Sequence, residues 1–413
     1  MDGMSSKNLY VLFISLFLLQ ILNGVVSYGQ SVNTKEISQE TALPKGSLIR
    51  IVSSSGKLNI KSWDQPKVKV TVRFMYDSLE KSGNDNNWFE DLGISIKPFS
   101  NRIDILTRSV FTQGKVPQKM APGDVRERAA MDAKLKTVRT PLGFRDFPTG
   151  KSRIETMTVM VPANSKLDLE SKYGDVVVSM DLDDAKLEIN SGTLDAQNIK
   201  NLNLVSDYCN VNLGNVEKAE VEFYNGTFRA QNIKELDIDS RSSNIEYEKG
   251  EYLYLRSQTD EIDIQEIARV EGRKVYGSIK IDQLNESFDL EGNNVDVKFR
   301  NISPGTSLIK INNKYGDVRL PVKNLKNYFV DFTGYYSTVF APFQKQIVKD
   351  EEAGSVNAQE EEKVAILKAS QDQKPRTSVG ELAPRRFTST VGDTKAKHTR
   401  IELICNSCTV DFK

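Results

Sequence analysis

Cysteine and histidine, the side chains that most often hold metals or act as nucleophiles, are scarce in this chain. Its 413 residues include three cysteines, Cys209, Cys405 and Cys408, and one histidine, His398. Three scattered cysteines do not supply the four ligands of a zinc cage. A single histidine in a polar segment leaves Ser-His-Asp and Cys-His catalysis without support. The sequence therefore predicts no metal, no cofactor and no catalysis of these kinds.

Cys405 and Cys408 have the spacing of a redox motif, but their surroundings favour a structural role. Redox pairs usually begin a helix, where the pKa of a thiol is lowered. This pair instead joins two alternating segments, Arg400 to Leu403 and Thr409 to Phe412. We predict that it closes a tight local disulfide that fastens the C-terminal strands. Free thiols are the alternative, and a redox or metal role is the third.

Neighbouring carboxylates are the remaining groups with catalytic chemistry. Parallel β-helix enzymes that cleave polysaccharides use acidic pairs, and glycoside hydrolysis in general needs two carboxylates. The acidic pairs of this chain are Asp183-Asp184, Asp260-Glu261 and Glu360-Glu361. Nothing in the sequence distinguishes one pair from another. We therefore interpret them as outward-facing charges that keep strands and loops soluble, and we predict that the protein is not an enzyme.

Tyrosine recurs at one position of a repeated pattern, directly before the small residue of a turn. The five tyrosines are Tyr173, Tyr208, Tyr276, Tyr315 and Tyr336. If the repeats are in register, these rings lie along one edge of the molecule. An exposed edge would stack on sugar rings or on the apolar groups of a partner, whereas half-buried rings would only pad the turns. The five are the candidate binding residues for a glycan or for an envelope or surface protein.

The elements that must position these tyrosines are short strands repeated about every 17 residues. The first apolar position of the strand after the turn is occupied in turn by Val176, Leu194, Val211, Phe228, Ile245, Ile262, Ile279 and Val295. Two residues earlier stands a small residue such as Gly174 or Gly192, which is predicted to take the positive φ of a tight corner. Strands at such a short period, without helices, indicate an all-β fold, a single-stranded β-solenoid that we expect to be right-handed.

Two segments without this alternation divide the chain. Residues 45–109 are predicted to form the N-terminal strands and cap, 153–344 the solenoid repeats, and 399–413 the strands that close the solenoid. Residues 110–152, which are polar and basic, and residues 345–398 are predicted to be flexible insertions. Good helix formers within 350–370 predict a short helix in the second insertion.

The N-terminus and the charge balance bear on location and partners. Residues 1–29 contain Lys7, an apolar run and an exit of small residues, which is typical of a signal peptide. An uncleaved anchor is the alternative, because the apolar run has about the minimum length that spans a bilayer. Lys+Arg and Asp+Glu both number 56, which argues against nucleic acid as a partner. We expect export to the periplasm, the cell surface or the medium, with membrane contact only through residues 1–29 if they stay attached.

Several phrases in a fixed order resemble a family of bacterial exported β-strand-repeat proteins of unknown function that are labelled putative adhesins. They are residues 55–64, residues 157–162, residues 167–170 and the Tyr-Gly-Asp-Val phrase at Tyr173. The resemblance spans residues 45–340 and the last dozen residues. It implies a β-solenoid, a cell-envelope or surface location and no established enzymatic activity, and it carries over no catalytic residue. The two insertions and the Cys405-x-x-Cys408 motif depart from the family pattern.

Taken together, these patterns predict a non-catalytic exported protein of the cell envelope or surface that acts as an adhesin or interaction module. The first alternative is a periplasmic scaffold that associates through the ends of the solenoid by strand addition. The second alternative is a polysaccharide-active β-helix enzyme.

Overall fold

The computed structural model describes residues 32–44, 46–54, 56–77, 88–107, 153–163, 165–348, 385–393 and 395–413. The predicted signal segment 1–29, the insertion 110–152 and the predicted helix within 350–370 lie outside these residues. Within the described residues the chain is almost entirely strand, with one short helix, α2 (Trp88–Asp91). None of the helices described there is long and apolar enough to cross a membrane.

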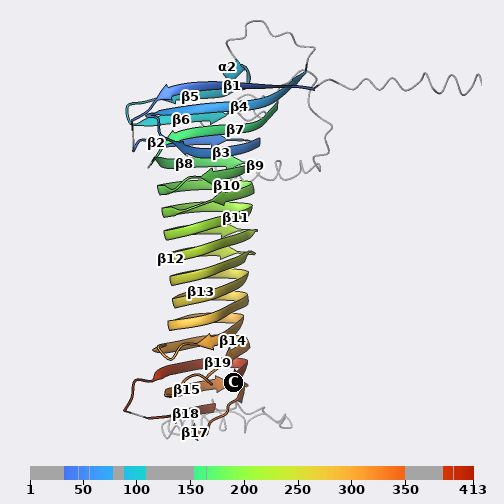
Figure 1. Ribbon diagram of the computed structural model, residues 1–413. Helices are drawn as coiled ribbons and strands as arrows, with labels where there is room; N and C mark the ends of the chain where they lie inside the picture. Colours follow the sequence, from blue (N-terminus) through green and yellow to red (C-terminus); the bar gives the residue numbers. More distant parts are fainter. Residues whose placement is uncertain are drawn as a thin grey trace, which may run out of the picture.

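All strands belong to one sheet of 19 strands, which is coiled into a column. Figure 1 shows the layers stacked one on another, with the N-terminal strands at the top and the C-terminal strands at the bottom. The upper end contains β1 (Val32–Ala42), β2 (Leu48–Ser53), β3 (Gly56–Trp63), β4 (Lys67–Asp77), β5 (Ile94–Pro98), β6 (Arg102–Thr107) and β7 (Arg153–Pro162). The column continues through β8 (Lys166–Lys172), β9 (Gly174–Ser179), β10 (Leu182–Ala196), β11 (Ile199–Tyr224), β12 (Thr227–Arg241), β13 (Asn244–Ile302) and β14 (Leu308–Leu320). The lower end contains β15 (Tyr328–Tyr335), β16 (Thr338–Phe340), β17 (Gln346–Ile347), β18 (Arg385–Val391) and β19 (Thr399–Phe412).

Parallel pairing places like residues of successive layers over one another. Leu194 of β10 pairs with Val211 of β11, and Val211 pairs with Phe228 of β12. The predicted apolar column from Val176 to Val295 is confirmed as core, since all eight side chains are at most 1% exposed. Burying each such side chain stabilises the fold by about 1.5–3 kcal/mol. Alternation of apolar and polar residues produces this result because successive side chains of a strand point to opposite faces.

The corners agree with the prediction in place, but most differ from it by one residue in where the positive φ falls. In most layers positive φ is taken by the residue before the predicted glycine, for example by Ser191 rather than Gly192. Gly192 is needed for another reason, since a Cβ there would collide with the carbonyl oxygen of Gly174 in the layer above. The sequence marked the corner correctly but assigned the left-handed conformation to the neighbouring residue.

The order of layers also departs from the order of the sequence. β19 lies between β14 and β15, pairing in parallel with both, so residues 399–413 do not close the solenoid as predicted. At the other end β2 lies between β6 and β8, and the stack ends in the antiparallel strands β4 and β1. β1 begins at Val32, ahead of the predicted start at residue 45. The apolar alternation is the same in every layer, so the sequence pattern alone does not predict which layers become neighbours.

Part of the predicted insertion 345–398 is strand rather than flexible loop. β18 pairs antiparallel with β15, and the two residues of β17 pair with β18. Phe387 of β18 is buried and stacks on Phe332 of β15, with 5.0 Å between the ring centroids. Only Phe387 and Ser389 of this strand point inward, and two inward residues among polar neighbours are too few to predict a strand from the sequence.

Candidate binding edge of corner tyrosines

One line of residues with left-handed backbone runs along the column. Pairings such as Gly56 with Gly174, Gly192 with Cys209 and Gly316 with Cys408 place the corners of successive layers over one another. Eleven non-glycine residues with φ between 52° and 62° occupy these corners. In order along the column they are Tyr173, Ser191, Tyr208, Asn225, Ser242, Thr259, Tyr276, Asn294, Tyr315, Ser407 and Tyr336. We call this line the corner edge.

The structure brings all five predicted tyrosines to this edge and leaves their rings in solvent. Their exposed fractions are 66% for Tyr173, 57% for Tyr208, 50% for Tyr276, 55% for Tyr315 and 66% for Tyr336. None of the five hydroxyls makes a hydrogen bond within the part of the chain that the structure describes. Rings that padded the corners would be covered and bonded to neighbouring turns, so the geometry is that of an accessible surface.

The backbone under these tyrosines is costly to form. A left-handed conformation costs a non-glycine residue roughly 1–2 kcal/mol, and only asparagine and aspartate are enriched there. Asn225 and Asn294 fit that preference, whereas tyrosine does not. Residues that are at least half exposed on a strained backbone are candidates for a role outside folding.

The small residues after the corners have a structural task that explains two of the cysteines. The side chain at this position donates a hydrogen bond to a backbone carbonyl two residues earlier. Ser243 Oγ donates to Arg241 O at 2.8 Å, and Cys209 Sγ donates to Asp207 O at 3.2 Å. Cys408 Sγ makes the equivalent contact with Asn406 O at 3.6 Å. A thiol or hydroxyl at this position therefore satisfies a corner carbonyl that would otherwise lack a partner.

A buried polar cluster lies beside the corner edge, and sequence reasoning missed it. Ser240 Oγ and Ser257 Oγ donate to Asp260 Oδ2 at 2.7 and 2.6 Å. Lys274 Nζ donates to Ser257 Oγ at 3.0 Å and to the backbone oxygen of Asp260 at 2.6 Å. Asp260 and Lys274 are both 0% exposed, so Asp260 is not the outward-facing charge that we predicted. The signal was present: Ser240, Ser257 and Lys274 occupy one inward position in three successive repeats.

The serine and lysine of this cluster do not form a catalytic pair. Ser257 Oγ already donates its proton to Asp260, and the lysine is enclosed with it inside the column. Lys274 is 0% exposed, so the amine that would have to act as the base is closed to a substrate. The cluster therefore belongs to the fold, where it satisfies polar groups inside the stack.

A family model described as Toastrack DUF4097 matches residues 132–374, more than half of the chain. The chain belongs to the Toastrack DUF4097 family. This confirms the resemblance read from the repeated phrases. The comparison with curated proteins found no match.

Three solved structures share similarity with this Toastrack DUF4097 protein. A putative adhesin from Parabacteroides distasonis has 14% identity and a TM-score of 0.34, covering 68% of this chain and 95% of its own. A putative adhesin from Bacteroides fragilis has 12% identity and a TM-score of 0.27, covering 67% and 97%. A putative cell adhesion protein from Clostridium sporogenes has 10% identity and a TM-score of 0.17, covering 92% and 99%.

The predicted disulfide of the Toastrack DUF4097 chain is not formed in the structure. Cys209, Cys405 and Cys408 are all free and buried. The thiols of Cys405 and Cys408 contact each other, and this hydrogen bond together with burial raises the pKa of Cys405. The same hydrogen bond lowers the pKa of Cys408, against the effect of burial. Both thiols are enclosed in the core, so burial and not the pKa limits their reactivity.

We expect thiol titration to find three free thiols per chain under denaturant and very slow labelling of the folded protein. The cause of the slow labelling is burial, since the three side chains are at most 4% exposed. Measuring the colour yield of a thiol reagent with and without guanidinium chloride checks this. One thiol per denatured chain would show that Cys405 and Cys408 are joined after all.

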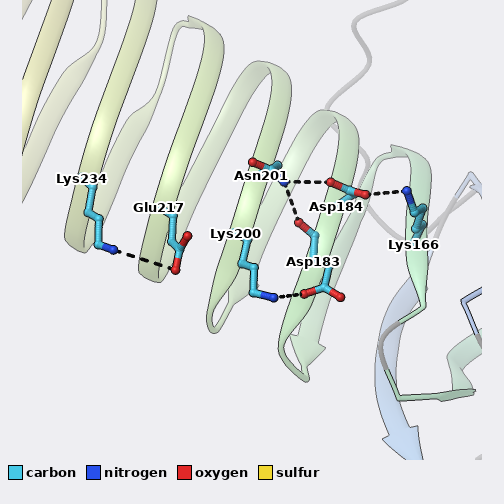
Figure 2. A network of polar contacts seen from close by, with 7 residues as sticks. All are labelled: Lys166, Asp183, Asp184, Lys200, Asn201, Glu217 and Lys234. Atoms are coloured by element: carbon cyan, nitrogen blue, oxygen red, sulfur yellow. Dashed lines mark hydrogen bonds and ion pairs between the residues drawn. The ribbon is translucent and has the colours of Figure 1, made fainter.

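Opposite charges alternate at the second turn of the Toastrack DUF4097 layers, about half a repeat along the chain from the corner tyrosines. Figure 2 shows Lys200 reaching Asp183 and Lys234 reaching Glu217, at 2.5 and 3.9 Å. In the same network Asp184 accepts from Asn201 and pairs with Lys166 at 2.7 Å. The side chains of Asp183 and Asp184 are each 42% exposed, so this acidic pair faces outward as predicted.

Lys200→Glu is expected to lower the melting temperature, because it would place three acidic side chains in successive layers at Asp183, residue 200 and Glu217. The hydrogen bond that Lys200 donates to Asp183 and the attraction of that carboxylate raise the pKa of Lys200, so the native pair favours the charged lysine. Melting curves at low and high salt check this, since salt screens exposed charges. Lys200→Arg is the control and should melt like the wild type. A Lys200→Glu loss that salt leaves unchanged would contradict the electrostatic explanation.

Proposed function

We propose that this protein is a non-catalytic, exported interaction module that binds a glycan or a surface protein through the tyrosines of its corner edge. The observation that carries the proposal is the exposure of five tyrosine rings on strained corners along one line. Tyrosine offers a flat apolar face and a polar tip, which suits recognition of sugars and protein surfaces. Adhesion is the role that such a rod fits best, because a long column presents its edge at a distance from its attachment point.

We also propose the length of each solenoid rung, the handedness of the coil and the cellular location of the protein. Registers such as Leu187 with Leu204 and Val221 with Ile238 support a rung of about 17 residues, and a right-handed coil stays our prediction. The signal-like segment 1–29 supports export to the periplasm, the cell surface or the medium. Contact with the membrane would then be limited to that segment.

Protease shaving of intact cells tests the proposed location. We expect a protease added outside the cells to release fragments that an antibody against this chain detects, while a known periplasmic protein stays intact. Protection of the chain until the envelope is broken would contradict surface adhesion. That result would favour the alternative, a periplasmic scaffold that associates through the ends of the solenoid.

A further inference from the structure

We infer that the ligand of the corner edge is a neutral, extended glycan chain that lies along the column and places alternate sugar rings on alternate layers. This inference rests on the proposed function and names the ligand class for the same edge. It draws on three features of the edge: the phase of the tyrosines, the residues between them and the charges beside them.

The tyrosines occupy only every second layer. Numbered along the corner edge, Tyr173 is first, Tyr208 third, Tyr276 seventh, Tyr315 ninth and Tyr336 eleventh. Layers of a sheet are about 4.8 Å apart, so the rings recur at about 10 Å or at twice that distance. The fifth layer is the one odd-numbered layer without a tyrosine, and Ser242 occupies its corner. A ligand that uses all five rings must therefore repeat about every 10 Å over a length of roughly 50 Å.

An extended glycan has this repeat, because every second sugar of a flat β-linked chain presents the same face to one side. A peptide strand does not, since its same-face side chains recur at about 7 Å. A polyproline helix repeats at about 9 Å and is the nearest protein rival. The long regular repeat of a polysaccharide favours the glycan, because it continues unchanged over the full length of the edge.

The residues between the tyrosines suit hydroxyl groups. Every even-numbered corner carries a short hydroxyl or amide side chain. These residues are Ser191, Asn225, Thr259, Asn294 and Ser407. Ser191, Asn225 and Asn294 already donate to the side chains of Asn190, Asp207 and Asn293. Their oxygens remain acceptors for sugar hydroxyls. A polyproline helix offers carbonyl acceptors and almost no donors, so it would leave these oxygens without partners.

The charges beside the edge are mixed. Lys172, Arg241 and Lys314 lie next to corners, but so do Asp175, Asp207, Glu261 and Asp317. An acidic polysaccharide would call for a basic stripe, which these alternating signs do not provide. A neutral chain meets no repulsion along the edge, so we assign the ligand to that class.

Two single substitutions on adjacent corners test the phase directly. Ser242→Tyr completes the alternate-layer series, whereas Thr259→Tyr adds the same ring out of phase. Both residues are exposed and have similar backbones, with φ of 54° and 62°. The probes are N-acetylchitohexaose and cellohexaose, their disaccharides, a maltohexaose of coiled geometry and a proline-rich peptide. Binding to the full chain is measured by calorimetry.

We expect one of the two flat hexasaccharides to bind, and to bind more tightly than its disaccharide because it reaches several rings. Ser242→Tyr should tighten this binding about three- to tenfold, and Thr259→Tyr should change it less than twofold. Equal effects of the two variants, preference for maltohexaose or preference for the proline-rich peptide would overturn the glycan inference while leaving binding at the edge intact. If no probe binds and alanine at the tyrosines alters no adhesion of the protein, the proposed function itself fails.

Discussion

Asp260→Ala is expected to lower the free energy of unfolding by about 3–5 kcal/mol, the cost of leaving a buried charge without its partner. The carboxylate of Asp260 accepts three hydrogen bonds, from Ser240, Ser257 and the backbone nitrogen of Ser243. Its charge, with a smaller effect from Glu261, opposes the burial that lowers the pKa of Lys274. Alanine would leave both serine hydroxyls without their acceptor and would remove the stronger of the two charges that stabilise the buried lysine.

Asp263→Ala is the matched control for this change. Asp263 lies three residues further along β13, with its side chain 46% exposed, and pairs with Lys280 at 2.6 Å. Removing one partner of such an exposed pair costs about 1 kcal/mol or less. Urea titrations of the two variants and the wild type measure the difference. Asp260→Ala and Asp263→Ala variants of equal stability would show that the cluster does not support the fold.

The stability of the wild type should rise between pH 8 and pH 10.5 relative to a Lys274→Met variant. Burial lowers the pKa of Lys274 from 10.5 to about 8 in the folded protein. Between these values the unfolded chain holds a proton that the folded chain has released. Stability rises with pH wherever the unfolded state binds more protons, so the sign is positive in this window.

The full change across the window is about 3 kcal/mol, since each unit of pKa difference corresponds to about 1.4 kcal/mol. The methionine variant lacks this group but keeps every tyrosine and the other lysines. Subtracting its stability from that of the wild type at each pH therefore isolates Lys274. Parallel stability curves for the two proteins would contradict an enclosed lysine.

The core and the corner edge could be predicted because both follow from the repeat of about 17 residues in the sequence. Val176, Leu194 and their successors recur at the same interval as the corners, so alternation alone placed them inside. Tyr173 and Tyr276 precede a small residue in their repeats, and this common position predicts that they share one edge. The left-handed residue was assigned one place too late, because glycine both tolerates positive φ and permits close contact of layers.

The order of the layers and the buried polar cluster depend on long-range contacts, which the 17-residue repeat of the sequence does not encode. β19 pairs with β14 and β15, which precede it by many residues in the sequence. The repeated sequence motif is similar in all three strands, so it does not predict this pairing. The inward position of Lys274 was visible in the repeat, but charge is normally a mark of the surface. Its burial is explained only by Ser257 and Asp260, which the folded column brings around it.

The central claim is that the corner tyrosines bind a ligand and do not hold the fold together. The most direct test uses one triple variant, Tyr173→Ala, Tyr276→Ala and Tyr315→Ala. Its binding is measured on an array of glycans and surface proteins, and its thermal unfolding is measured on the same sample. Tyr254→Ala, which removes an exposed ring away from the corner edge, is the control. We predict at least a tenfold loss of binding by the triple variant, with a melting temperature within about 2 °C of the wild type. A triple variant that binds like the control, or that loses stability in step with binding, would contradict the account.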